Sequence, residues 1–192
     1  MGNRKVSHFF VFIFGMNIKR QLKQLDRQLN FKRNKEIYHK KSNGQWGYYI
    51  NPHFDQVVEY LNEKNLKKVI DLGAGEGHVI ELLNDMGFQA KGYEIEDELI
   101  EQYHQKFNKD NIIKKDIMFL TTDDIKDFEV IYFYDPFRDL ELKKNFLIYI
   151  TNIVIPDQTI IYKHEKDRIK NYLSEVTGLK TEVYHFLEIF RK

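Results

Sequence analysis

Four groups of residues in this sequence combine residue types that can bind a polar ligand. They are the glycine segment Asp71-Leu72-Gly73-Ala74-Gly75-Glu76-Gly77, then Glu94, then Asp116, then Asp135-Pro136-Phe137. Successive acidic positions are 23, 22 and 19 residues apart. Glycines let the main chain turn sharply beside a ligand, and carboxylates accept hydrogen bonds from hydroxyl and amino groups. We therefore expect the four groups to meet at one edge of a layered fold.

The glycine segment joins an expected strand to an expected helix. The apolar run 69–72 is typical of a short buried strand, and apolar residues at helical spacing from 79 to 86 predict a helix. A strand, a glycine turn and a helix N-terminus form the phosphate- or nucleoside-binding corner of a doubly wound α/β fold. A dinucleotide fingerprint needs a glycine at the sixth position, where this sequence has His78. No Gly-Lys-Ser/Thr follows, and a tight turn in some other α/β protein stays open.

The pattern Asp-Leu-Gly-x-Gly-x-Gly at 71–77 resembles the first motif of class I S-adenosylmethionine-dependent methyltransferases. Residues 69 to about 164 resemble that domain as a whole, because the four groups follow one another in the order of the family. The resemblance implies that the cofactor is S-adenosylmethionine and the product S-adenosylhomocysteine. The cofactor-binding residues that it implies are Asp71, Gly73, Gly75, Gly77, Glu94, Ile95, Asp116 and Ile117.

Each of these residues has a role within the resemblance, and the two acidic residues also have an alternative. The glycines would pass close to the amino acid and ribose parts of the cofactor. Glu94 would accept hydrogen bonds from the ribose hydroxyls, and the alternative is a solvated glutamate in an acidic stretch. Asp116 would accept from the adenine amino group while Ile117 packs against the ring, and the alternative for Asp116 is an N-cap or a turn.

The resemblance places the fourth motif, beside the transferable methyl group, at Asp135-Pro136-Phe137. The catalytic residues that we expect are Tyr134, Asp135, Pro136 and Phe137. Asp135 could accept a hydrogen bond from an amine nucleophile, or a proton from a lysine acceptor. Whichever of Tyr132, Tyr134 and Phe137 face the cleft could attract a sulfonium or an ammonium through cation–π contacts. Enzymes that methylate amino groups of bases or of glutamine commonly carry Asp/Asn-Pro-Pro-aromatic, and the single proline here departs from that pattern.

The elements that must position these residues alternate between strands and helices. Apolar and β-branched runs predict strands over 69–72, 88–93, 112–115, 128–134 and 159–162. Helical spacing predicts helices over 51–66, 79–86, 97–107, 145–155 and 167–176. Residues 180–191 alternate as one long strand or as a tight pair. The alternation predicts an α/β fold with a doubly wound, mostly parallel sheet and helices on both faces, the Rossmann-like methyltransferase arrangement.

Residues 1–45 are expected to form an apolar and basic helical extension, and 46–192 the S-adenosylmethionine-binding methyltransferase domain. The apolar run 9–14 is too short to span a bilayer, so no transmembrane segment is expected. It would pack on the domain or on another subunit of a homo-oligomer. Residues 1–41 carry eleven basic side chains against two acidic ones, a net charge of +9 in a chain of net charge +1. This basic arm could bind RNA or an acidic protein, or be only a solvated face.

A hydrophobic content of 42% supports a sizeable core, which excludes a chain that is disordered throughout. The sequence has no cysteine and its histidines are scattered, so we expect a cytoplasmic protein without a metal site. The expected function is that of an S-adenosylmethionine-dependent methyltransferase whose acceptor is an amine nitrogen on a macromolecule, protein or RNA. The alternatives are a small-molecule methyltransferase whose arm is a lid, and a non-catalytic module that keeps the fold.

Overall fold

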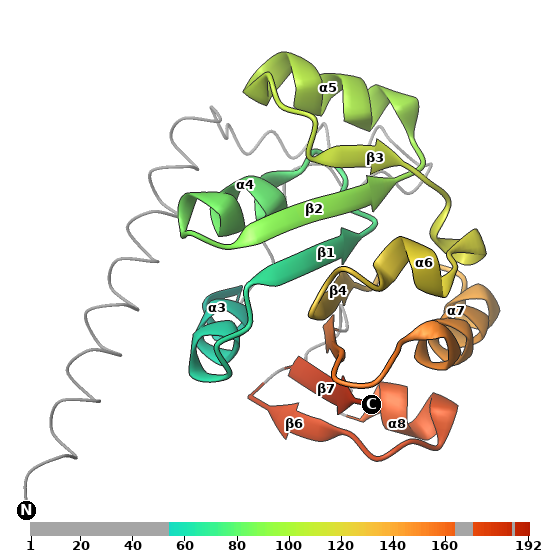
Figure 1. Ribbon diagram of the computed structural model, residues 1–192. Helices are drawn as coiled ribbons and strands as arrows, with labels where there is room; N and C mark the ends of the chain where they lie inside the picture. Colours follow the sequence, from blue (N-terminus) through green and yellow to red (C-terminus); the bar gives the residue numbers. More distant parts are fainter. Residues whose placement is uncertain (1–53, 164–170, 186) are drawn as a thin grey trace, which may run out of the picture.

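A seven-stranded sheet forms the centre of the computed structural model, which describes residues 54–163, 171–185 and 187–192 (Figure 1). The strands lie in the order β3-β2-β1-β4-β5-β7-β6. Their bounds are β1 Lys68–Leu72, β2 Gln89–Glu94, β3 Ile112–Lys114, β4 Val130–Tyr134, β5 Thr159–Lys163, β6 Glu182–Tyr184 and β7 Leu187–Arg191. β1 to β5 are parallel, and β7 is antiparallel to both β5 and β6. The predicted mostly parallel sheet is confirmed.

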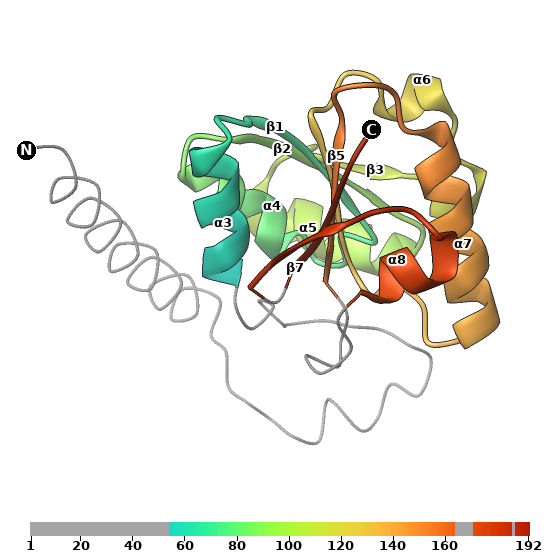
Figure 2. The ribbon, with the colours of Figure 1, turned by 90° about the horizontal axis from the view of Figure 1, so that it is seen from below.

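Helices cover both faces of this sheet, as the doubly wound fold predicts (Figure 2). Their bounds are α3 Phe54–Glu63, α4 His78–Asp85, α5 Asp97–Phe107, α6 Thr122–Ile125, α7 Leu140–Ile153 and α8 Tyr172–Thr177, with a short 3₁₀ helix η1 at Ile117–Phe119. Side chains of α3, α4 and α5 belong to one buried apolar cluster, and side chains of α7 and α8 belong to another. The sheet therefore separates two hydrophobic cores.

Alternation along each strand supplies both cores. In β1, Val69 packs with the first cluster and its neighbour Ile70 with the second, and both are fully buried. In β5, Ile161 and Ile160 are divided in the same way. Successive side chains of a strand point to opposite faces, so the centre of a strand that is covered on both sides is apolar on both faces. This is why the runs 69–70 in β1, 130–133 in β4 and 160–162 in β5 are continuously apolar in the sequence.

The strand order reverses at β1, which lies between β2 and β4. The chain passes from β3 back across the sheet to β4, and this crossover makes β1 and β4 the topological switch point. In open α/β sheets, ligands bind outside the carboxyl ends of the strands at such a point. Asp71, near the carboxyl end of β1, is level with Gly92 of β2 and with Tyr132 of β4.

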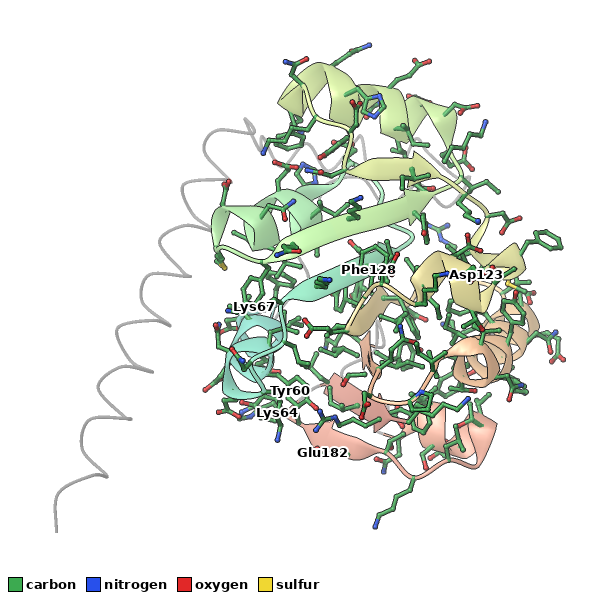
Figure 3. All side chains as sticks on the ribbon, viewed as in Figure 1. Tyr60, Lys64, Lys67, Asp123, Phe128 and Glu182 are labelled. Carbon is green, nitrogen blue, oxygen red and sulfur yellow. The ribbon has the colours of Figure 1, made fainter. Side chains whose placement is uncertain are left out.

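The amino ends of the same strands are closed by polar contacts of the main chain. The Glu129 carboxylate accepts hydrogen bonds from the backbone N–H groups of Lys67 and Lys68, at 2.6 and 2.8 Å. These bonds lower the pKa of Glu129. Figure 3 shows Lys67 where β1 begins, at the end opposite its arrowhead. The two ends of the sheet are thus chemically distinct.

The bounds of α7 and α8 differ from the sequence-based expectations, and residues 180–191 adopt one of the two expected arrangements. α7 begins at Leu140, five residues before the predicted start, because the Asp139 side chain accepts a hydrogen bond from the Leu142 N–H at 2.7 Å. Residues 180–191 form the pair β6 and β7, and His185 at the turn has a φ of 56°. The predicted helix over 167–176 is described only from residue 171, and α8 ends it one residue later than expected.

The predicted N-terminal extension, residues 1–45, lies outside the described residues, as do its apolar run and its basic helix. The division into an extension and a domain therefore stays a prediction. Within the part of the chain that the structure describes, no helix is both long and apolar enough to cross a membrane.

Candidate active site

The carboxyl ends of β1, β2 and β4 bring three of the four predicted groups into contact. The Gly75 N–H donates a hydrogen bond to Glu94 Oε2 at 2.8 Å, which joins the glycine loop to the end of β2. A Cβ atom on Gly73 would lie 3.1 Å from Pro136 Cβ, so the same loop also meets the segment after β4. The fourth group, at Asp116, follows β3, whose Lys114 is level with Glu94.

The glycine loop needs glycine at each of its three positions. Gly73, Gly75 and Gly77 have φ values of 81°, 56° and 73°, in the left-handed region that costs other residues energy. A Cβ atom on Gly77 would also lie 2.6 Å from Tyr103 Cε2 and 2.9 Å from Ile112 Cδ1. The loop is therefore fixed both by its backbone conformation and by the side chains of α5 and β3 beneath it.

Glu94 is buried, and its carboxylate fixes the turn around it. Oε2 accepts from the Gly75 N–H, while Oε1 accepts from the N–H groups of Ile95 and Glu96 at 2.8 and 3.1 Å. The Ile95 side chain is half exposed at this rim. A carboxylate has about four lone-pair sites, so these three bonds leave it able to accept from a ligand hydroxyl.

Asp71 is a second buried carboxyl group at the same rim. Burial, and secondly the charge of Glu94, raise the pKa of Asp71 to about 8. Two carboxyl groups that share a buried region disfavour ionising together. The region thus favours either a proton on Asp71 or a nearby positive charge.

Asp116 and Ile117 are placed by η1. The Asp116 side chain accepts a hydrogen bond from the Met118 N–H at 2.9 Å and caps η1, which confirms the N-cap alternative as one of its roles. Ile117 is buried and packs with the apolar cluster of α7 and α8. The Lys115 N–H donates to the Glu94 main-chain oxygen at 2.9 Å, so this segment is tied to the end of β2.

Asp135, immediately after β4, is buried in an ion pair with Lys143 of α7. The Tyr162 hydroxyl of β5 lies 3.4 Å from Asp135 Oδ1, and burial together with this carboxylate raises the pKa of Tyr162. Asp135 has a φ of 40°, a left-handed conformation that aspartate tolerates better than most residues. Of its predicted neighbours, Tyr134 is half-buried, and Phe137 packs on Phe146 with the ring centroids 5.1 Å apart.

A second polar cluster lies under the glycine loop and was not predicted. The Lys106 ammonium is 3.4 Å from Glu76 Oε2 and 3.2 Å from His78 Nε2. Burial, and secondly Lys106, lower the pKa of His78 to about 3, so this histidine is neutral. Lys106 therefore donates to an unprotonated Nε2. Lys106 is 30 residues from Glu76 and 28 from His78 in the sequence, so no local spacing could have connected it to them.

Neither protein-family models nor the sequences of curated proteins give a match to this chain. Solved structures do give matches. The PH0226 protein of Pyrococcus horikoshii OT3 gives a TM-score of 0.53 at 18% identity, covering 74% of this chain and 92% of that one. A TehB-like SAM-dependent methyltransferase of Corynebacterium glutamicum gives 0.52 at 17% identity, covering 74% of this chain and 100% of that one. This chain therefore has the fold of class I S-adenosylmethionine-dependent methyltransferases.

Proposed function

We propose that this protein is an S-adenosylmethionine-dependent methyltransferase and that its acceptor is an amine nitrogen on a macromolecule. The observation that carries the proposal is the hydrogen bond from Gly75 to the buried carboxylate of Glu94 at the switch point of the sheet. It joins a strained glycine loop to an acidic strand end, and such a pair can hold a nucleoside by main-chain contact and by ribose hydrogen bonds.

The charge of the rim fits this cofactor. Asp71 and Glu94 are both buried, and the raised pKa of Asp71 reflects the cost of ionising it there. S-adenosylmethionine carries an ammonium and a sulfonium, which can compensate buried carboxylates. Glu94 would hold the ribose, Ile95 would lie along it, and the glycines would admit the amino acid part. Asp116 would bind the adenine amino group with the carboxylate that also caps η1.

When bound, S-adenosylmethionine supplies a methyl group that is already electrophilic. The protein then has to align the acceptor with that methyl group and exclude water, and it needs little acid–base chemistry. Asp135 and the main chain of Pro136 would orient the acceptor nitrogen. Tyr134 and Phe137 would form the apolar wall beside it. We expect the methyl transfer to need no metal, and this stays a prediction.

The charge distribution favours RNA as the macromolecule. Residues 1–41 have a net charge of +9 in a chain whose total is +1, so the remainder has a net charge of −8. A basic segment on an acidic body suits a phosphate backbone, whose binding is driven by neutralised phosphates. An acidic protein is the alternative partner for the same segment.

Isothermal titration calorimetry with the full chain tests the proposal. S-adenosylmethionine and S-adenosylhomocysteine should bind, and NAD should not, because the third glycine of a dinucleotide site is missing. Transfer of a tritiated methyl group to the RNA fraction of a cell extract should follow. No binding of S-adenosylmethionine would contradict the proposal. Binding without transfer would indicate a non-catalytic module, and label confined to small molecules would indicate a small-molecule methyltransferase.

A further inference from the structure

We propose that Lys143 makes the acceptor subsite electrically neutral, so that the subsite takes an uncharged amino group, as on a nucleobase, and rejects an ammonium. Lys143 would be a specificity-determining residue that acts through Asp135. The inference rests on the proposed function and names the acceptor chemistry of the same site.

The contact between the two side chains carries the inference. Lys143 and Asp135 are 4% and 5% exposed, and the Lys143 ammonium is paired with Asp135 Oδ1. A buried charge of either sign is costly alone, because water no longer solvates it, and a buried partner offsets that cost. The Tyr162 hydroxyl contacts the same oxygen from β5. Asp135 is thus a fixed hydrogen-bond acceptor whose charge is already compensated.

The position of Lys143 in α7 is not explained by helix stability. It is the fourth residue after the N-cap Asp139, in the first turn of the helix. A cation at a helix N-terminus opposes the helix dipole, and acidic residues are favoured there. The exposed neighbour Lys144 could stay solvated, whereas the Lys143 side chain is buried against Asp135. The pairing with Asp135 is therefore what this lysine provides.

Among the described residues, two other buried charged groups at this end of the sheet, Lys163 and Glu188, are of opposite sign. Lys163, at the carboxyl end of β5, is level with Tyr134 and is 1% exposed, so a second cation is buried near this rim. The Glu188 carboxylate of β7 accepts from the N–H groups of Leu173 and Ser174, both at 2.8 Å, and caps α8. The charge of Asp135 also acts on Tyr172: burial, and secondly this carboxylate, raise the pKa of the Tyr172 hydroxyl.

A neutral subsite discriminates between acceptors by their charge. A lysine side chain has a pKa of about 10.4 and arrives as an ammonium. That ammonium would lose its solvating water without gaining a counter-charge, because Lys143 already offsets the charge of Asp135. An amino group conjugated to a base ring arrives uncharged and can donate one N–H to Asp135. Its nitrogen then bonds to the methyl carbon, the carbon–sulfur bond breaks with its electrons on sulfur, and the nitrogen loses one proton to water.

The test uses the full chain, tritiated S-adenosylmethionine and the RNA and protein fractions of a cell extract, with the labelled nitrogen identified after hydrolysis. The label is expected on a base amino group. At saturating cofactor the transfer rate should be flat between pH 6.5 and 8.5, whereas an ammonium acceptor would give about a tenfold rise per pH unit.

Variants separate specificity from folding. Lys143→Met should reduce transfer to RNA by at least tenfold with calorimetric affinity for S-adenosylmethionine unchanged, while Lys143→Arg keeps most of the activity. Lys144→Met, at the exposed neighbour, should behave as wild type. The double variant D135N/K143M restores neutrality and keeps an acceptor oxygen. It should recover both the urea midpoint and part of the transfer that K143M loses.

Methyl-lysine or a methylated terminal amine as the product would overturn the inference. So would K143M transferring to RNA at the wild-type rate, or a folded double variant that is no faster than K143M. If the wild-type chain binds S-adenosylmethionine but labels no fraction, the proposed function falls, and this inference falls with it. Failure to bind the cofactor is visible separately in the calorimetry.

Discussion

The main-chain N–H of Gly75 donates a hydrogen bond to Glu94 Oε2 at 2.8 Å, so the side chain that ends β2 also fixes the turn that follows β1. One carboxylate thereby has two tasks. It holds the loop in a left-handed conformation at Gly75, and it presents lone pairs to the rim of the sheet. Because both tasks depend on the same group, replacing it should affect the loop and the ligand together.

We predict that Glu94→Gln weakens S-adenosylmethionine binding by about 100-fold in calorimetry. Hydrogen bonds to a charged group contribute about 1.5–3 kcal/mol each, and about 1.4 kcal/mol corresponds to a factor of ten. Glu96→Gln is the matched control, since that side chain is exposed two residues away. Equal affinities of the two variants would remove Glu94 from the proposed cofactor site.

Gly77→Ala should destabilise the fold by about 2–5 kcal/mol in urea unfolding. The left-handed backbone costs about 1–2 kcal/mol, and overpacking against Tyr103 and Ile112 adds about 1–3 kcal/mol. Gly87→Ala is the control, because Gly87 has a φ of 86° and no atom within 4 Å of an added Cβ. It should lose only the backbone part. If both variants lose the same free energy of unfolding, contacts of the added Cβ with Tyr103 and Ile112 do not contribute to the destabilisation.

Asp71 should make the protein less stable as the pH rises. Its pKa is about 8 in the folded chain and near 3.8 in the unfolded chain, so between these values the folded chain holds the extra proton. This contribution is fully present below about pH 4 and is lost as the pH rises toward 8. The difference in urea midpoint between wild type and Asp71→Asn should therefore change over pH 5–8.5, in favour of the variant. A difference in urea midpoint that stays constant over this pH range would contradict the prediction.

His78 should have the opposite effect at lower pH. Its pKa is about 3 in the folded chain and 6.5 in the unfolded chain, so acid favours unfolding. The contribution is present above pH 6.5 and is lost as the pH falls toward 3. His78→Gln should lose less stability than wild type between pH 7 and 4.5 in thermal unfolding. Parallel pH curves for His78→Gln and wild type would contradict this expectation.

Local sequence patterns were sufficient for the parallel strands and the glycine loop. β1 and β4 are apolar on both faces, and three glycines with positive φ stand between a strand and a helix. They were not sufficient for α7, because Leu140 and Leu142 are exposed and interrupt the apolar period of its first turns. η1 and α6 have three and four residues, too few for a helical period to be read.

The polar partners of the site could not be predicted because they are distant in the sequence. Lys143 follows Asp135 by eight residues, and the intervening chain turns from a strand into a helix before the two side chains meet. Tyr162 reaches the same carboxylate from a strand 27 residues away. A sequence shows a lysine on a helix and a tyrosine on a strand, whereas only the packed sheet brings them to one oxygen.

The antiparallel pair β6 and β7 constrains the order in which the sheet assembles. β7 lies between β5 and β6, and within the described chain β6 pairs with no strand other than β7. β6 therefore cannot join by itself: the hairpin either forms first and docks on β5 as a unit, or β7 adds to β5 and β6 folds back afterwards. In both routes Ile189→Pro would remove a backbone N–H from β7 at the residue level with Ile161 of β5 and Glu182 of β6, and a β7 that left β5 would take β6 with it.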